Sequence, residues 1–160
     1  MHEEPCAEHK WLDRLVGRWV SESECNMGPD QPPITSTGKV TFRSLGGLWV
    51  MGEGEGEMPD GGTMSSVITL GYDPRAGRFV GTFIASMMTY LWPYAGSLDD
   101  DRKVLTLDSE GPSFSSPDAM AKYQDIIEVI DDDHWVLSSR FQDDEGRWNS
   151  FMKAAHRRAE

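Results

Sequence analysis

The chain has 160 residues, with 15 Lys and Arg against 27 Asp and Glu, for a formal net charge of −12 at pH 7. This negative field repels phosphate backbones and anionic lipid surfaces, so we expect no nucleic acid and no membrane partner. The acidic start, Met1-His2-Glu3-Glu4-Pro5, lacks the apolar run of a secretory signal. No stretch approaches the roughly 20 apolar residues of a membrane-spanning helix. We therefore expect a cytoplasmic protein with one hydrophobic core.

The first regular element expected from the sequence is a short helix. Residues 1–7 are polar, and we expect them to form a disordered tail before a single barrel domain at 8–160. Apolar residues recur with helical spacing between positions 8 and 16, which places them on one helix face. They are Trp11, Leu12, Leu15 and Val16. Gly17 ends the pattern, so the helix should lie over an end or an edge of the barrel.

Beyond Gly17, polar and apolar residues alternate with a period of two, which is typical of strands with one buried face. Turns rich in Pro, Gly and Asp separate these strands. The predicted strands are 18–26, 34–45, 48–57, 63–72, 78–86, 89–98, 103–110, 121–130, 134–142 and 148–156. No connection is long enough for a crossover helix, so neighbouring strands should pair antiparallel. The pattern predicts an all-β fold, a ten-stranded antiparallel up-and-down barrel with a short N-terminal helix.

Several segments resemble one bacterial family, domain of unknown function 1579. The segment from Glu8 to Trp19, EHKWLDRLVGRW, is similar to the opening of that family. Further similar pieces are Ser44-Leu45-Gly46-Gly47 followed by Leu48-Trp49, then Gly71-Tyr72-Asp73, and Ser86-Met87 with Thr89 close behind. The resemblance runs from about Glu8 to the C-terminal strand. It implies a lipocalin-like (calycin) barrel. It does not point to any enzymatic activity, because none is assigned to the family as a whole.

Gly17-Arg18-Trp19 also matches the Gly-x-Trp sequence that opens many calycin barrels. In those barrels the Trp closes one end and packs against a basic residue of the last strand. The resemblance therefore implies a contact between Trp19 and either Arg157 or Arg158.

Haem-binding barrels of the nitrobindin type share part of this opening. They carry Gly-x-Trp-x-Gly-x-Gly in the first strand and a haem-ligating His late in the chain. This chain has Ser21 and Ser23 in place of the two later glycines, and His156 lies in its last predicted strand. We expect no cofactor, and haem remains an alternative that depends on His156.

Alternation turns aromatic and small residues toward the barrel interior, a lining that is typical of small-molecule sites. A ten-stranded barrel is wide enough to hold a ligand. The alternative is a filled core, because six Trp and six Phe tend to be buried in any fold. The candidate ligand-binding residues are Trp19, Ser23, Phe42, Phe83, Tyr90, Trp92, Tyr123, Trp135, Ser139, Phe141, Met152 and His156. In the last strand the same alternation groups Trp148 and Ser150 with Met152, Ala154 and His156.

Other chemistry-bearing residues give weaker signals. Cys6 and Cys25 are expected to be free thiols, and neither has an obvious His beside it in the sequence, so no catalytic thiol is predicted. No His, Cys or Asp grouping has the spacing of zinc ligands, so we expect no metal site. The Asp runs at 99–101 and 131–133 are interpreted as turns. The sequence does not fix whether Asp125 faces inward.

These features are compatible with three functions. The first is a barrel that binds a small hydrophobic molecule in its interior without catalysis. The second is an enzyme or a haem-binding barrel acting on a small apolar ligand, with His156 as base or ligand. The third is a structural or interaction module, and a homo-oligomer is left open.

Overall fold

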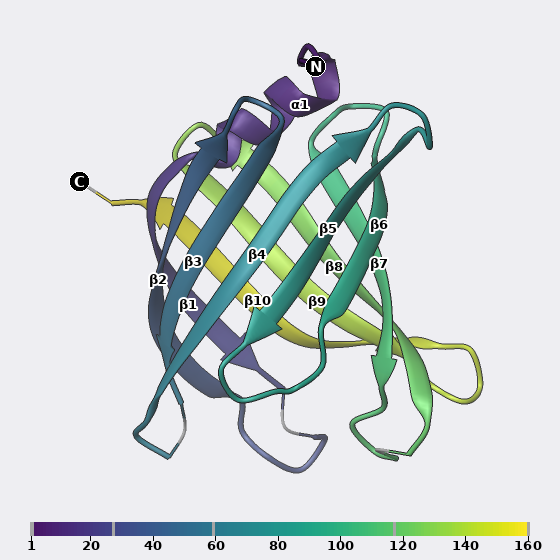
Figure 1. Ribbon diagram of the computed structural model, residues 1–160. Helices are drawn as coiled ribbons and strands as arrows, with labels where there is room; N and C mark the ends of the chain where they lie inside the picture. Colours follow the sequence, from purple (N-terminus) through teal and green to yellow (C-terminus); the bar gives the residue numbers. More distant parts are fainter. Residues whose placement is uncertain (1, 27, 59, 117, 160) are drawn as a thin grey trace.

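Ten strands close into one barrel in the computed structural model, which describes residues 2–26, 28–58, 60–116 and 118–159. The strands are β1 (Gly17–Cys25), β2 (Ile34–Leu45), β3 (Trp49–Glu57), β4 (Thr63–Asp73), β5 (Arg78–Ala85), β6 (Trp92–Leu98), β7 (Val104–Pro112), β8 (Met120–Asp131), β9 (His134–Gln142) and β10 (Trp148–Arg158). Each strand pairs antiparallel with its neighbours in sequence, and β1 pairs with β10 to close the barrel (Figure 1). The fold predicted from the sequence is confirmed.

One end of the barrel is covered by the N-terminal segment. The helix α1 (Ala7–Leu12) and the 3-10 turn η1 (Asp13–Leu15) cross above the strand ends (Figure 1). The helix begins at Ala7, the last residue of the segment expected to be a tail. Neither of these helical segments, within the part of the chain that is described, is long and apolar enough to cross a membrane.

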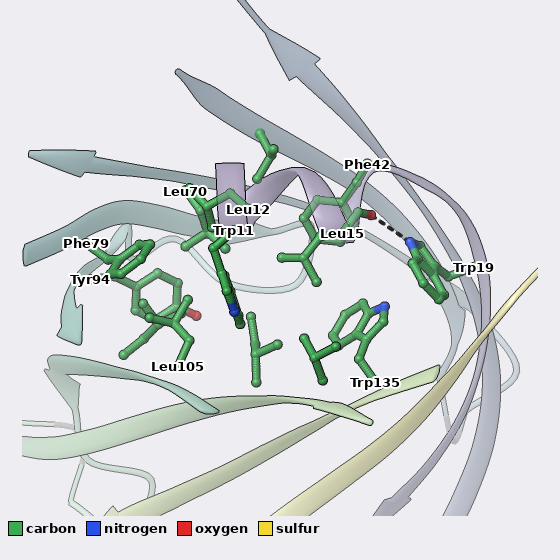
Figure 2. Close-up of a cluster of buried hydrophobic side chains, with 14 residues drawn as sticks. Trp11, Leu12, Leu15, Trp19, Phe42, Leu70, Phe79, Tyr94, Leu105 and Trp135 are labelled. Atoms are coloured by element: carbon green, nitrogen blue, oxygen red, sulfur yellow. Dashed lines mark hydrogen bonds between the residues drawn. The ribbon is translucent and has the colours of Figure 1, made fainter. Parts of the chain in front are cut away.

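Apolar side chains of the N-terminal segment enter the barrel and form its core with the strands. Leu12 and Leu15 are almost completely buried. Trp11 Nε1 donates to the carbonyl of Arg102 at 2.7 Å. Trp19 Nε1 donates to the carbonyl of Leu15 at 2.8 Å (Figure 2). These bonds satisfy the polar atoms of two large indoles while their rings are removed from water. We call the half of the barrel that lies under α1 and η1 the closed half, and the half at the other end of the strands the open half.

The Gly–Glu alternation of β3 shows how the sequence shapes the wall. The glutamates of the strand face water. A Cβ atom at Gly52 would come within 2.7 Å of the Phe42 ring and 2.8 Å of Ile68. The absence of a side chain at Gly52 therefore lets Phe42 fill the closed half.

The sixth strand is shorter than predicted. It begins at Trp92 rather than residue 89, because its partner β5 ends at Ala85. The backbone N–H of Ser86 then donates to Ser65 on β4 at 2.8 Å. Tyr90 therefore belongs to the connection between β5 and β6.

The predicted face of β10 is wrong at its beginning. The strand register shifts between Ser150 and Met152, so the alternation reverses there. Trp148 lies outside, with the Arg140 guanidinium 5.0 Å from its ring centroid, and Ser150 is exposed. The extra residue, Phe151, contacts the ring of Phe141 with 6.0 Å between the centroids.

Candidate ligand-binding site

Four of the predicted site residues lie in the closed half and contact one another. The rings of Trp135 and His156 are stacked, with 3.7 Å between centroids and 3° between planes. Trp19 and Phe42 each meet the edge or face of Trp135 at 5.9 Å. All four residues are buried (Figure 2 shows three of them). The closed half is therefore a filled core rather than a cavity.

His156 is the titratable group of this core. Burial lowers its pKa from the ordinary value of 6.5 to about 4, so the imidazole is neutral at pH 7. Its Nδ1 atom is buried without a hydrogen-bond partner in the described part of the chain. A base of such low pKa is poorly matched to proton abstraction at neutral pH.

The open half differs from the closed half in both composition and exposure. Phe83, Phe141 and Met152 lie at inward positions of β5, β9 and β10, yet all three are only partly buried. On the other wall, the hydroxyls of Ser23 and Ser36 form a hydrogen bond of 2.6 Å. Because the ten strands form a continuous wall, inward side chains can reach solvent only through an end of the barrel. Solvent therefore reaches inward side chains of the open half, whereas those of the closed half are buried.

Aromatic rings gather at the mouth of this half. Trp92 contacts Tyr90 at 5.0 Å and Tyr123 at 4.9 Å between centroids, and Phe114 contacts Tyr123 at 5.3 Å. Phe114 is largely exposed. We call this set the open-end aromatic cluster: Tyr90, Trp92, Phe114, Tyr123, Phe141 and Phe151. It offers an apolar surface to flat molecules.

A polar group lies deeper in the barrel than the aromatic cluster, where the side chains of Tyr94, Asp125 and Ser139 meet. Asp125 of β8 accepts hydrogen bonds from the hydroxyls of Tyr94 and, at 2.6 Å, of Ser139. Asp125 keeps some exposed area, but its carboxyl is enclosed among interior side chains, and this burial raises its pKa. The two hydroxyl bonds oppose that rise without cancelling it. Burial and the neighbouring Asp125 carboxyl also raise the pKa of Tyr94 well above its ordinary value.

Two buried hydrogen-bonding atoms near this group have no partner among the described residues. They are Trp92 Nε1 and Ser109 Oγ. The pairing of β6 with β7 ends with Ala95 opposite Asp108, so Tyr94 and Ser109 are the next residues of the two strands, and a Cβ atom at Gly111 would come within 2.2 Å of the Trp92 ring. A buried donor without a partner costs about 1–3 kcal/mol, so such atoms usually meet a water or a ligand.

Eight of the twelve predicted site residues lie in or near this half, but the prediction missed part of the polar group. Tyr94 was not among the predicted site residues. Asp125 was left open because apolar residues flank it on both faces of β8. Phe151 was missed because a strict alternation places it outside. No local pattern in the sequence marks a strand bulge, and only the strand pairing reveals it.

A separate surface hollow lies mainly over the outer faces of β2 to β5. Its volume is about 720 Å³, and Lys39, Glu55 and Ile84 are among its lining residues. These three residues alternate with the inward positions of their strands. This hollow therefore involves a different surface from the open-end aromatic cluster.

Comparison with known proteins gives the fold and the family. Rv2717c from M. tuberculosis is similar over 98% of this chain and 100% of its own, with 16% identity and a TM-score of 0.64. The S-type phycobiliprotein lyase CPES from Guillardia theta is similar over 97% of this chain and 94% of its own, with 11% identity and a TM-score of 0.63. EF1p2_mFAP2b bound to DFHBI is similar over 94% of this chain and 98% of its own, with 13% identity and a TM-score of 0.50.

At these identities the similarity to the solved structures shows the lipocalin-like barrel fold alone. No curated protein matches the sequence. The family model described as "protein of unknown function (DUF1579)" matches residues 4–158, which is nearly the whole sequence. The chain therefore belongs to the DUF1579 family.

Proposed function

We propose that this protein binds a small, mainly apolar molecule in the open half of the barrel, without catalysis. The observation that carries the proposal is the buried indole Nε1 of Trp92, which has no partner among the described residues although only 8% of the residue is exposed. A ligand oxygen could accept this hydrogen bond, while the open-end aromatic cluster removes the rest of the molecule from water.

The charges of the site indicate the class of ligand. The chain carries a net charge of −12, and the enclosed carboxyl of Asp125 lies behind the aromatic rings. Both features disfavour an anion. We therefore expect a neutral, flat molecule with at least one hydrogen-bond acceptor. A cytoplasmic location and the absence of nucleic acid or membrane partners are part of the same proposal.

Barrels of similar fold support a ligand-binding role. One of the solved structures is bound to DFHBI, a small molecule. Another is named a phycobiliprotein lyase. Neither property transfers to this chain directly, and the proposal depends on the side chains of the open half.

Binding is tested with Prodan, a neutral bicyclic naphthyl ketone whose fluorescence rises when it leaves water and whose carbonyl oxygen can accept a hydrogen bond. We expect saturable binding to the intact protein and a Kd at least about fivefold weaker for Trp92→Phe, a loss of about 1 kcal/mol for one hydrogen bond. Trp148→Phe is the matched control, because Trp148 lies at the same end on the outer surface. Absence of dye binding, or equal weakening by both variants, would contradict the proposal.

A second candidate function depends on His156. The buried Nδ1 without a partner favours a role as ligand to a metal centre such as haem. The surroundings fit such a group poorly, because Trp135 covers one face of the imidazole and is itself packed against Trp19 and Phe42. The visible spectrum of the purified protein tests this candidate. A haem band that His156→Ala abolishes would support it, and colourless protein after incubation with haem would exclude it.

A further inference from the structure

A cysteine and a histidine meet outside the barrel, at the start of α1. The Sγ atom of Cys6 lies 3.2 Å from Nδ1 of His9. The other ring nitrogen, Nε2, lies 3.0 Å from the backbone carbonyl oxygen of Tyr72. The expectation that neither thiol has a histidine beside it is therefore wrong for Cys6. The two residues are three positions apart, and the first turn of the helix brings them together.

The carbonyl of Tyr72 fixes which nitrogen of His9 carries the proton. A carbonyl oxygen only accepts, so Nε2 of the neutral imidazole must donate to it. Nδ1 is then the acceptor, and it faces both the backbone N–H of Cys6, at 3.0 Å, and the thiol. His9 is 5% exposed, so this orientation is held by packing. A base oriented by a third group beside a thiol is the arrangement of an activated nucleophile.

We propose that Cys6 is a modification site, a nucleophilic thiol that His9 activates toward soft carbon electrophiles. In the reaction with an α-haloamide, Nδ1 of His9 takes the thiol proton as the sulfur attacks. A bond forms between sulfur and carbon, and the halide leaves with the electrons of the broken carbon–halogen bond. Cys6 is partly exposed, which gives an electrophile of this size access to the sulfur.

The other charged groups around the thiol are Glu8 and Arg102. A carboxylate oxygen of Glu8 lies 3.5 Å from Sγ, and Arg102 lies 3.4 Å from the other oxygen of the same carboxylate. The Arg102 guanidinium offsets the negative charge that would otherwise oppose a thiolate. Glu8 is farther from the sulfur than His9 is, so His9 is the nearer proton acceptor.

The competing explanation is purely structural. Cys6 precedes the first residue of α1 and His9 is its third residue, so their reciprocal bonds form a capping box. Gln is one of the usual residues at the position of His9 in such a box. His9→Gln therefore retains a side chain that can accept from the Cys6 N–H, but it removes the base. The two roles are separable by this one substitution.

The test measures alkylation of both cysteines by iodoacetamide at pH 7, with peptide mass mapping to assign each site. Cys25 is the internal control, because burial raises the pKa of its thiol and its sulfur has no histidine contact among the described residues. We expect native Cys6 to react faster than Cys6 in urea-unfolded chain. His9→Gln should slow Cys6 at least about tenfold, since a positioned base contributes roughly 10²-fold or more. The rate at Cys25 should stay unchanged.

Equal rates for native and unfolded Cys6, or no effect of His9→Gln in a folded variant, would overturn the proposal. Circular dichroism shows whether the variant folds. If it does not, the rate of Cys6 alkylation is measured as a function of pH in the wild-type protein, both folded and unfolded. A base-assisted Cys6 keeps its reactivity to lower pH than the unfolded thiol does, and coincident profiles would leave Cys6 as a helix cap only.

Discussion

The guanidinium of Arg158 lies 4.2 Å from the ring centroid of Trp19, so side chains of the last and first strands are in contact where these two strands pair. The same side chain donates from Nη1 to the carbonyl of Val16 at 3.0 Å and from Nη2 to the carbonyl of Asp132 at 2.7 Å. Of the two arginines that the calycin resemblance suggested, Arg158 makes the contact. It links the beginning of β1, the turn between β8 and β9, and the end of β10 where the barrel closes.

Arg158→Lys should lower the free energy of unfolding by about 1–3 kcal/mol. An ammonium group cannot reach two carbonyls and cover the Trp19 ring at the same time, whereas the planar guanidinium does all three. Urea unfolding followed by circular dichroism measures the change. Arg157→Lys is the control, because Arg157 is exposed on the opposite face of β10. Equal midpoints for the two variants would show that the contact adds no stability.

Asp125→Asn should change the pH dependence of stability. Burial raises the pKa of Asp125 in the folded state, so the folded state holds the proton more tightly than the unfolded chain does. The stability that this group contributes is complete below its ordinary pKa of 3.8 and is lost as the pH rises through the raised value. Urea unfolding from pH 4 to 8 should show the wild type losing stability relative to Asp125→Asn. A constant difference between them would contradict the burial of the carboxyl.

The barrel itself was predictable because its strands carry a regular signal. Alternation and turn residues define each strand locally, and short connections leave antiparallel pairing as the simple solution. The apolar helix face predicted in the same way that the helix lies over an end or an edge of the barrel, and the resemblance to calycin openings implied that Trp19 closes one end. Each of these features depends on residues that are adjacent or one helical turn apart in the sequence.

The site was only partly predictable because it depends on contacts between distant residues. Tyr94 and Asp125 are 31 positions apart, and nothing local indicates that their side chains meet. Trp135 and His156 were predicted to line a cavity, but their stacking fills that space. Composition predicts that aromatic side chains turn inward. It does not predict which of them pack together and which leave room.

His156→Leu should remove a source of acid sensitivity. Burial lowers the folded-state pKa of His156 from 6.5 to about 4, so the unfolded chain binds a proton more readily than the folded protein between these values. The wild type should lose up to about 3 kcal/mol relative to the variant as the pH falls from 6.5 to 4. Unfolding in urea at pH 7, 5.5 and 4.5 measures this difference. His134→Gln is the control at an exposed imidazole, and an effect as large there would disprove the assignment to His156.

Ser23→Phe should block the proposed site from the wall opposite Trp92. In the closed strand order β1 lies five strands from β6 in either direction, so an added ring at Ser23 enters the open half from across the barrel. The new side chain would occupy the room that a ligand needs, and we expect dye binding at least about tenfold weaker, or about 1.4 kcal/mol.

Ser23→Ala is the matched control for this substitution. It removes the hydrogen bond between the hydroxyls of Ser23 and Ser36 without adding volume, so it should leave dye binding close to the wild type. Unfolding in urea checks that both variants stay folded. Unchanged binding by a folded Ser23→Phe would place the dye outside the barrel, because a phenyl ring and a bicyclic dye cannot share that interior.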